Sequence, residues 1–110
     1  MATVDKDQIF TALAIRDTSN HNSDKSDTGE FTAETIVVLN GLDQQVTFQF
    51  QGSIDATTWL NINNTFNVAA TTNSFETISD SYFPCYRMTA ICSGGSPTSG
   101  VLDAWILKTS

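Results

Sequence analysis

The chain has 110 residues, 40% of them hydrophobic and 15% charged, and this length predicts one domain, residues 1–110, with one core. Twelve acidic residues against five Lys and Arg give a formal net charge of −7, so we expect neither nucleic acid nor an anionic membrane as a partner. The polar start of the chain predicts no secretory signal, and no apolar run is long enough to span a bilayer, which favours assembly in a cytoplasm.

The first predicted strand covers residues 8–16 and is apolar on both faces. Residues 17–30 contain Ser, Asn, Asp, Lys and Gly but no large apolar residue. A polar segment of this length is typical of a functional or disordered loop. We interpret it as a solvated loop and as the most exposed part of the chain.

Residues 32–40 form a β-branched run that predicts a strand, and the next strand begins almost directly after it. Residues 46–60 then read as a strand, a tight turn and a returning strand. Apolar and polar residues alternate with the period of a half-buried strand, and Gly52 opens a segment rich in turn-forming residues. The sequence therefore predicts a β-hairpin with one buried face, formed by Val46, Phe48 and Phe50.

The second half of the chain predicts four more short strands. Residues 61–64 are expected to be a loop, and residues 66–70 and 75–78 to be edge strands. Residues 82–92 alternate again, after a proline that suits the entrance of a strand. A Gly-Gly-Ser-Pro turn separates this strand from the closing strand, residues 101–108. The alternation places one set of side chains inward, Tyr86, Met88, Ala90 and Cys92, and Arg87 and Thr89 outward.

The two cysteines, Cys85 and Cys92, fall in the same predicted strand. Seven extended residues separate them by about 23 Å, whereas a disulfide needs Cα atoms within about 7 Å. We therefore expect two free thiols.

Seven or eight short strands, with turn residues between them and no helical stretch, predict an all-β fold, a single antiparallel β-sandwich. The predicted structural core takes the large residues of its best-patterned strands, which are Phe48, Phe50, Trp59, Tyr86, Met88 and Trp105.

No group of residues predicts a catalytic centre or a metal site. His21 is the single histidine and lies in the polar loop. Asp24 and Asp27 lie near Glu30 and Gly29, but the ligand pattern of an EF-hand is missing, so a charged, solvating loop is favoured over a calcium site. We expect no cofactor and no metal ion.

Glu34 and Asp103 are the acidic residues inside strong strands. We interpret each as an outward residue or as an ion-pair partner, with Arg87 or Arg16, rather than as one of the paired carboxylates of a glycosidase. An enzyme is therefore not expected.

A ten-residue stretch, Phe50-Gln51-Gly52-Ser53-Ile54-Asp55-Ala56-Thr57-Thr58-Trp59, resembles the strand, turn and strand of many small tailed-phage virion proteins. Ala56 stands where that group has glycine. Two later stretches are similar to strands of the same group, Tyr82-Phe83-Pro84-Cys85-Tyr86-Arg87-Met88 and Ser99-Gly100-Val101-Leu102. The match covers about residues 46–108, and comparable elements occur in galactose-binding-like sandwiches. The resemblance implies a jelly-roll or galactose-binding-like sandwich.

The same resemblance implies a non-enzymatic structural protein of the virion, assembled in the host cytoplasm. It would be a capsid decoration or head-stabilising protein that forms a homo-oligomer, with a trimer favoured, and that docks on a major capsid or tail protein. The candidate interaction residues are Ser53, Asp55, Thr58, His21, Asp24 and Asp27. The alternative is a carbohydrate-binding module that uses Trp59 and Tyr82, which lie near strand ends, as a platform for sugar rings.

Overall fold

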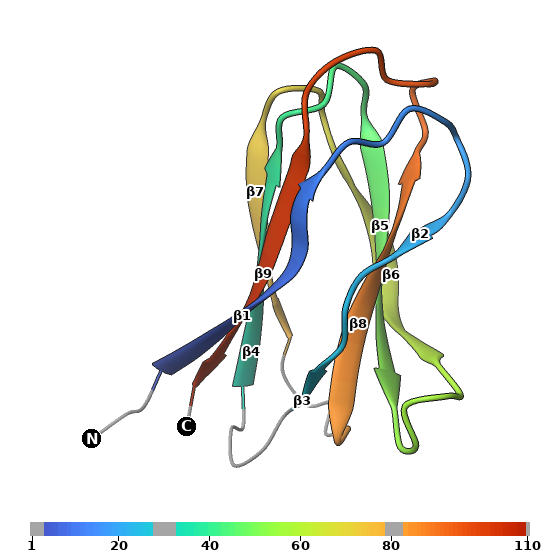
Figure 1. Ribbon diagram of the computed structural model, residues 1–110. Coiled ribbons are helices and arrows are strands. Elements are labelled where there is room, and N and C mark those ends of the chain that lie inside the picture. The colour runs from blue at the N-terminus through green and yellow to red at the C-terminus, as the bar shows by residue number, and fades with distance from the viewer. Residues whose placement is uncertain (1–3, 28–32, 79–82, 110) are drawn as a thin grey trace.

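The structure is a computed structural model that describes residues 4–27, 33–78 and 83–109. These residues form two antiparallel sheets packed face to face, with no helix among them (Figure 1). The predicted all-β antiparallel sandwich is confirmed.

The described residues contain nine strands, two of them only two residues long. They are β1 (Val4–Leu13), β2 (His21–Asn22), β3 (Ser26–Asp27), β4 (Ala33–Asn40), β5 (Val46–Ser53), β6 (Leu60–Val68), β7 (Asn73–Ile78), β8 (Cys85–Cys92) and β9 (Leu102–Thr109).

The strand order identifies the sandwich as a jelly roll. The first sheet has the order β1-β9-β4-β7, and the second has the order β2-β8-β5-β6, with β3 also paired to β8. Because β2 and β3 line the same edge of β8, they act as one interrupted strand. Each sheet then has four strand positions, and the chain crosses repeatedly between them, as in a jelly roll.

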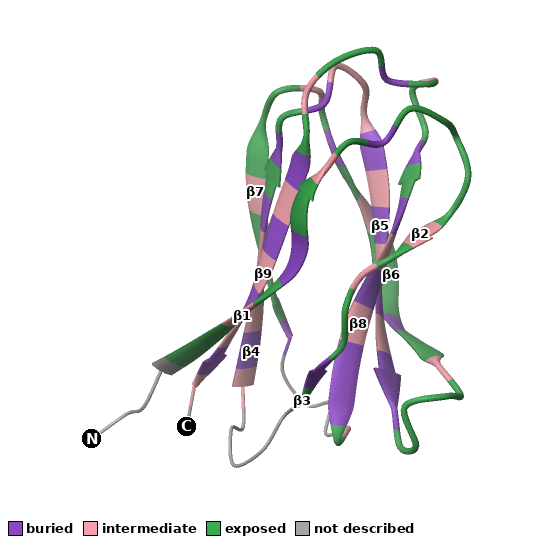
Figure 2. Cartoon of the chain, viewed as in Figure 1, coloured by how far each residue is buried: buried purple, intermediate pink, exposed green. Residues whose placement is uncertain are grey.

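The core lies between the sheets and follows the alternation of the strands. In β4, β5, β8 and β9 every second residue is buried, so the strands are banded in Figure 2. The predicted inward set is confirmed, because these side chains are at most 2% exposed: Val46, Phe48, Phe50, Tyr86, Met88, Ala90 and Cys92. Cys85 and Cys92 are both buried free thiols, as predicted.

The two tryptophans do not belong to this core, which corrects the prediction. Trp105 is half-buried and alternates with the buried Ala104 and Ile106, so its ring lies on the outer side of the first sheet. Trp59 is also half-buried and precedes β6, with its ring beneath the guanidinium of Arg87. An apolar flank in sequence indicated burial for both, but strand parity places Trp105 on the outer side and Trp59 lies outside a strand.

The loop predicted over residues 17–30 is partly wrong, because its backbone forms β2 and β3 on the edge of β8. Ser26 is only 1% exposed, and its hydroxyl donates to Asp7 Oδ2 over 2.6 Å. Residues 28–30 lie outside the described part of the chain, as does Tyr82. The segment covers one open side of the sandwich instead of extending into solvent.

Two strand boundaries also differ from the prediction. β1 begins at Val4 and ends at Leu13, and a register shift between Gln8 and Phe10 lets Ile9 and Phe10 both be buried. This bulge explains why the segment is apolar on both faces. β6 runs through the predicted loop at residues 61–64, and β6 and β7 are edge strands as expected.

Candidate functional site

The outer side of the first sheet carries an apolar surface. Strand pairing places Trp105, Val37 and Phe75 in one row across β9, β4 and β7. Phe75 is 70% exposed, and Leu39 is 36% exposed on the same side of β4. Exposed apolar side chains that form a contiguous patch mark interaction surfaces. We call this patch the apolar face and define it as Val37, Leu39, Phe75, Trp105 and Leu107.

The outer side of the second sheet is polar, and its side chains bond to one another. Gln51 accepts from Arg87 Nε over 2.8 Å and donates to Asn61 Oδ1 over 2.9 Å. Two rows further along the sheet, Thr47 donates to Asn67 over 2.7 Å. We call this surface the polar face and define it by the polar residues of its outward rows, Thr47, Gln49, Gln51, Asn61, Asn67, Arg87 and Thr89. Ile91, 40% exposed, is the apolar member of the Thr47 row on β8.

Gln49 holds an irregular part of the polar face together. The β5–β6 register shifts between Phe48 and Phe50, and the Gln49 amide donates to the carbonyls of Phe50, Ile62 and Asn63 over 2.9, 3.1 and 3.2 Å. The amide therefore supplies donors to carbonyls around the bulge. The side chain of Gln49 therefore stabilises the β5–β6 bulge.

Sequence reasoning missed the apolar face, although a signal for it exists. Ile36-Val37-Val38-Leu39 and Trp105-Ile106-Leu107 are continuous apolar runs. Such runs are typical of strands covered on both faces, whereas a strand with one solvated face alternates. β4 and β9 therefore have the sequence of doubly covered strands but lie in a sheet with one uncovered face.

Three of the predicted interaction residues lie at the end of β5 and in the β5–β6 turn, where they mainly support the turn. Asp55 Oδ1 accepts from the backbone N–H groups of Thr57 and Thr58 over 3.0 and 2.8 Å. These bonds hold the pKa of Asp55 well below its usual range. Ser53 is fully buried and its hydroxyl accepts from Ala56 N over 2.9 Å. Of the three, Asp55 and Thr58 are exposed.

The other three predicted interaction residues lie on the segment that covers β8. His21 Nε2 lies 2.8 Å from Asp17, and Lys25 contacts Asp27 over 2.9 Å. Asp27 and Ser53 both pair with Cys85, so Asp27 and the β5–β6 turn share one end of the sandwich (Figure 1). His21 pairs with Ala90, further along β8, and Asp24 is exposed. The six residues therefore do not form one cluster.

A charged group closes the core at the same end. Lys108, 5% exposed, donates to Asp7 Oδ2 over 2.9 Å and to the Asp27 carbonyl over 2.8 Å. Because Asp27 belongs to the second sheet, Lys108 joins the two sheets. Ser26 and Lys108 lower the pKa of Asp7 by hydrogen bonding to its carboxylate.

The prediction of an outward position is wrong for Glu34 and correct for Asp103, which lies on the outer side of β9 but has no arginine partner. Glu34 points inward and is 2% exposed, and burial raises its pKa, against the opposing charge of Lys108. Asp103 accepts from Gln8 Nε2 over 3.1 Å and from Ala12 N over 2.8 Å, so it bonds to β1 and not to an arginine. In the part of the chain that the structure describes, no three His, Cys, Asp or Glu side chains are arranged to hold a metal ion.

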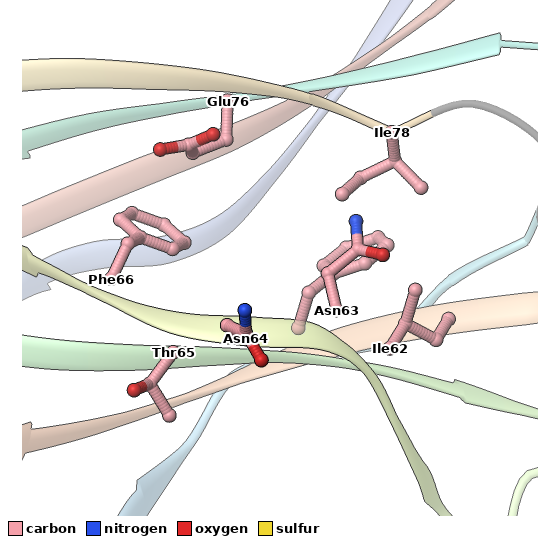
Figure 3. Close-up of a pocket in the computed structure, with 8 residues that line it drawn as sticks. Ile62, Asn63, Asn64, Thr65, Phe66, Glu76 and Ile78 are labelled. Atoms are coloured by element: carbon pink, nitrogen blue, oxygen red, sulfur yellow. The ribbon is translucent and has the colours of Figure 1, made fainter.

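A cleft of about 260 Å³ opens between β6 and β7, where the two sheets separate. Its apolar floor includes Phe50 and Ile62, and Figure 3 shows Phe66 and Asn63 of β6 across from Glu76 and Ile78 of β7. Asn63 has a φ of 61°, the left-handed region, and lies in the bulge opposite Gln49. Carboxylate and amide groups rim the cleft, an arrangement that suits a small polar ligand.

No family model matches the sequence, and no curated protein sequence matches it. Solved structures do share the fold. The SPBc2 prophage-derived protein YomS superposes with a TM-score of 0.73 at 11% identity, over 100% of this chain and 96% of that chain. The PBSX exported protein XepA superposes with a TM-score of 0.71 at 16% identity, over 98% of this chain and 36% of that chain.

A third structure, of Bacillus endospore appendages that form disulfide-linked pili, gives a TM-score of 0.54 at 14% identity, over 98% of this chain and 85% of that chain. The chain spans about a third of the length of XepA, and nearly the whole of YomS. The resemblance to β-sandwich proteins of phage origin is confirmed at the level of the fold. None of the described residues forms a helix that could cross a membrane.

Proposed function

We propose that the chain is a non-enzymatic structural protein of a phage particle, a capsid decoration or head-stabilising protein that docks on the particle surface as an oligomer. Its fold is shared with a prophage-derived protein, and jelly rolls recur in viral capsid proteins. Because a fold does not assign a function, the proposal rests on the surfaces of this chain.

The apolar face is the observation that carries the proposal. A chain with a net charge of −7 leaves Phe75 70% exposed, in one row with Val37 and Trp105. Removing such a surface from water is the main favourable contribution to protein association. Association with another protein molecule would bury this surface, as expected of a protein that functions in an assembly.

We assign the contact with a major capsid or tail protein to the end of the sandwich that holds Asp55, Thr58 and Asp27. Asp55 and Asp27 are exposed carboxylates in backbone segments tied to β5 and β8. Fixed carboxylates suit basic side chains on a partner. The apolar face then stays available for contacts within the oligomer.

The buried acid also fits a structural role. Glu34 is enclosed in the core and pairs in register with Lys108, so its carboxylate has no access to a substrate. A catalytic acid or base must reach the proton that it transfers. This supports assigning Glu34 to the interior of the fold and not to a reaction.

The proposal is tested on purified phage particles from the source strain, by mass spectrometry and by labelling with an antibody to the chain. We expect the chain in the particles in a fixed ratio to the major capsid or tail protein, with label on the outer surface. The variant Asp27→Lys, which leaves the turn held by Asp55 intact, should bind particles lacking the chain at least about tenfold more weakly. Absence of the chain from intact particles would contradict the proposal.

A carbohydrate-binding module is the second candidate, and the β6–β7 cleft is the observation that favours it. Phe66 could pack against a sugar ring while Glu76 and Asn63 bind hydroxyls. This candidate predicts that galactose or N-acetylglucosamine shifts the NMR signals of cleft residues in wild type but not in Glu76→Ala. Unchanged spectra with both sugars at millimolar concentration would remove it.

A further inference from the structure

The edges of both sheets carry features that block pairing with another strand. Edge strands recruit strands from other chains unless bulges, charges or short length prevent it. Glu76 on the β7 edge pairs with Ile36 and so occupies an inward position as a charged residue. β6 has a bulge with Asn63 at a φ of 61°.

The remaining edges are interrupted as well. β1 has two register shifts and an Ala12 with a φ of 45°. β2 and β3 are two residues each in the described chain. Association by extending a sheet is therefore disfavoured at every edge, and the outer faces are left as the route to assembly.

The apolar face is also close to electrically neutral. Among its described outward positions on β1, β4, β7 and β9, Lys6 and Asp103 are the charged ones, and their charges cancel. Two copies of a chain with a net charge of −7 repel each other. A neutral apolar surface is where a second acidic copy approaches at the lowest electrostatic cost.

The outer side of the first sheet is large enough for a specific contact. Its four strands, about 4.8 Å apart and eight residues long at about 3.3 Å each, cover roughly 500 Å², with the apolar face at the centre and polar side chains such as Thr35 and Thr77 around it. Two such sheet sides bury roughly 1,000 Å² in total, the lower limit for a specific interface. Two sheets that pack face to face align within about 30° and interdigitate their side chains, as Phe75 and Trp105 could do.

We propose that two copies of the chain associate through their apolar faces, about a two-fold axis, as the basic unit of assembly. In a two-fold contact each copy presents the same surface, whereas a three-fold ring needs two different complementary surfaces. The polar face uses its side chains in internal hydrogen bonds and does not complement an apolar patch. We therefore propose a dimer in place of the trimer that the family resemblance implies. This inference rests on the proposed function and deepens it, because it names a second copy of the chain as the partner of the apolar face.

Sedimentation velocity over a range of concentrations tests the dimer with a matched pair of variants. Phe75 and Ile54 are 70% and 75% exposed, but Ile54 lies in the β5–β6 turn. We expect Phe75→Lys to weaken association by at least about 30-fold, as a hot-spot residue does. Ile54→Lys makes the same change in charge and should leave association unchanged. Phe75→Ser removes the ring without adding charge and should also weaken association.

Circular dichroism establishes that each variant is folded. A wild-type chain that stays monomeric up to about 1 mM, a stable trimer, or an equal effect of Ile54→Lys and Phe75→Lys would overturn the inference. Because the measurement contains no phage particle, a monomeric chain would remove the dimer without deciding whether the protein belongs to a virion. That question is decided by the particle analysis above.

Discussion

The two outer faces of this sandwich differ in what their side chains contact. On the polar face, Gln51 bonds to both Arg87 and Asn61, and Gln49 bonds to three carbonyls. On the apolar face, Phe75 remains 70% exposed. The difference indicates that the polar face contributes to the stability of the chain itself, while the apolar face is left for association.

The largest expected effect comes from the two tryptophans, one beside each face. Trp105→Ala should weaken self-association by about 30-fold, because Trp105 lies in the central row of the apolar face. Trp59→Ala should leave association unchanged and reduce stability by about 1 to 2 kcal/mol, since it removes a half-buried ring and its contact with Arg87. Sedimentation and urea unfolding of both variants measure the two effects. If Trp59→Ala and Trp105→Ala weakened association equally, the assignment of association to the apolar face would be wrong.

Replacing one polar residue by alanine on each face should reduce stability more on the polar face than on the apolar face. Gln49→Ala should lower the free energy of unfolding by about 1 to 2 kcal/mol, because three carbonyls at the bulge lose their amide donor. Thr35→Ala, on the outward side of β4, should change it by less than about 0.5 kcal/mol. Urea unfolding measures both. A larger loss for Thr35→Ala would contradict the structural role of the polar face.

The turn of the polar sheet offers a smaller, stabilising change. Ala56 has a φ of 63°, a left-handed conformation that glycine adopts without strain. Ala56→Gly should therefore raise the free energy of unfolding by about 0.5 to 1 kcal/mol. Ala33→Gly in the strand β4 is the matched control and should lower it by a similar amount. If both changes destabilise, the turn does not strain Ala56.

The smallest expected effects are pH dependences of opposite sign. The lowered pKa of Asp55 contributes stability above its unfolded pKa, and this stability is lost as the pH falls through the folded value. The raised pKa of Glu34 acts in reverse, because stability is lost as the pH rises from the unfolded pKa through the folded value. Thermal unfolding between about pH 1.5 and 7 measures both, because the contribution of Asp55 is lost only below its unfolded pKa. We expect Asp55→Asn to flatten the acid side and Glu34→Gln to raise stability at pH 7 but not at pH 3.

Much of the fold follows from the sequence because local patterns are strong where one sheet face is buried. Alternation correctly placed Phe48 and Phe50 of β5, and Tyr86 and Met88 of β8, in the core. Alternation failed where a segment of polar residues pairs with the edge of a strand, as β2 and β3 do with β8. Those residues have weak strand propensity, and only the tertiary position of β8 provides their hydrogen-bond partners.

The candidate site was harder to predict, for a physical reason. A continuous apolar run indicates that both sides of a strand suit an apolar cover, but the run containing Val37 and the run containing Trp105 do not reveal which side this chain covers itself. The strand order decides it, because no segment in the described chain lies over the outer side of β4 and β9 (Figure 1). Parity also separates Trp105 from Ala104 and Ile106 once the inward set is known.

The contrast between the faces is tested most directly by the fluorescence of single-tryptophan variants, because Trp59 and Trp105 are the two tryptophans of the chain. Trp59→Phe leaves Trp105 as the reporter of the apolar face, and Trp105→Phe leaves Trp59 as the reporter beside the polar face. As protein concentration rises, we predict that Trp105 shifts to the blue and loses access to acrylamide, while Trp59 stays constant. A response from Trp59, or none from Trp105, would contradict association through the apolar face.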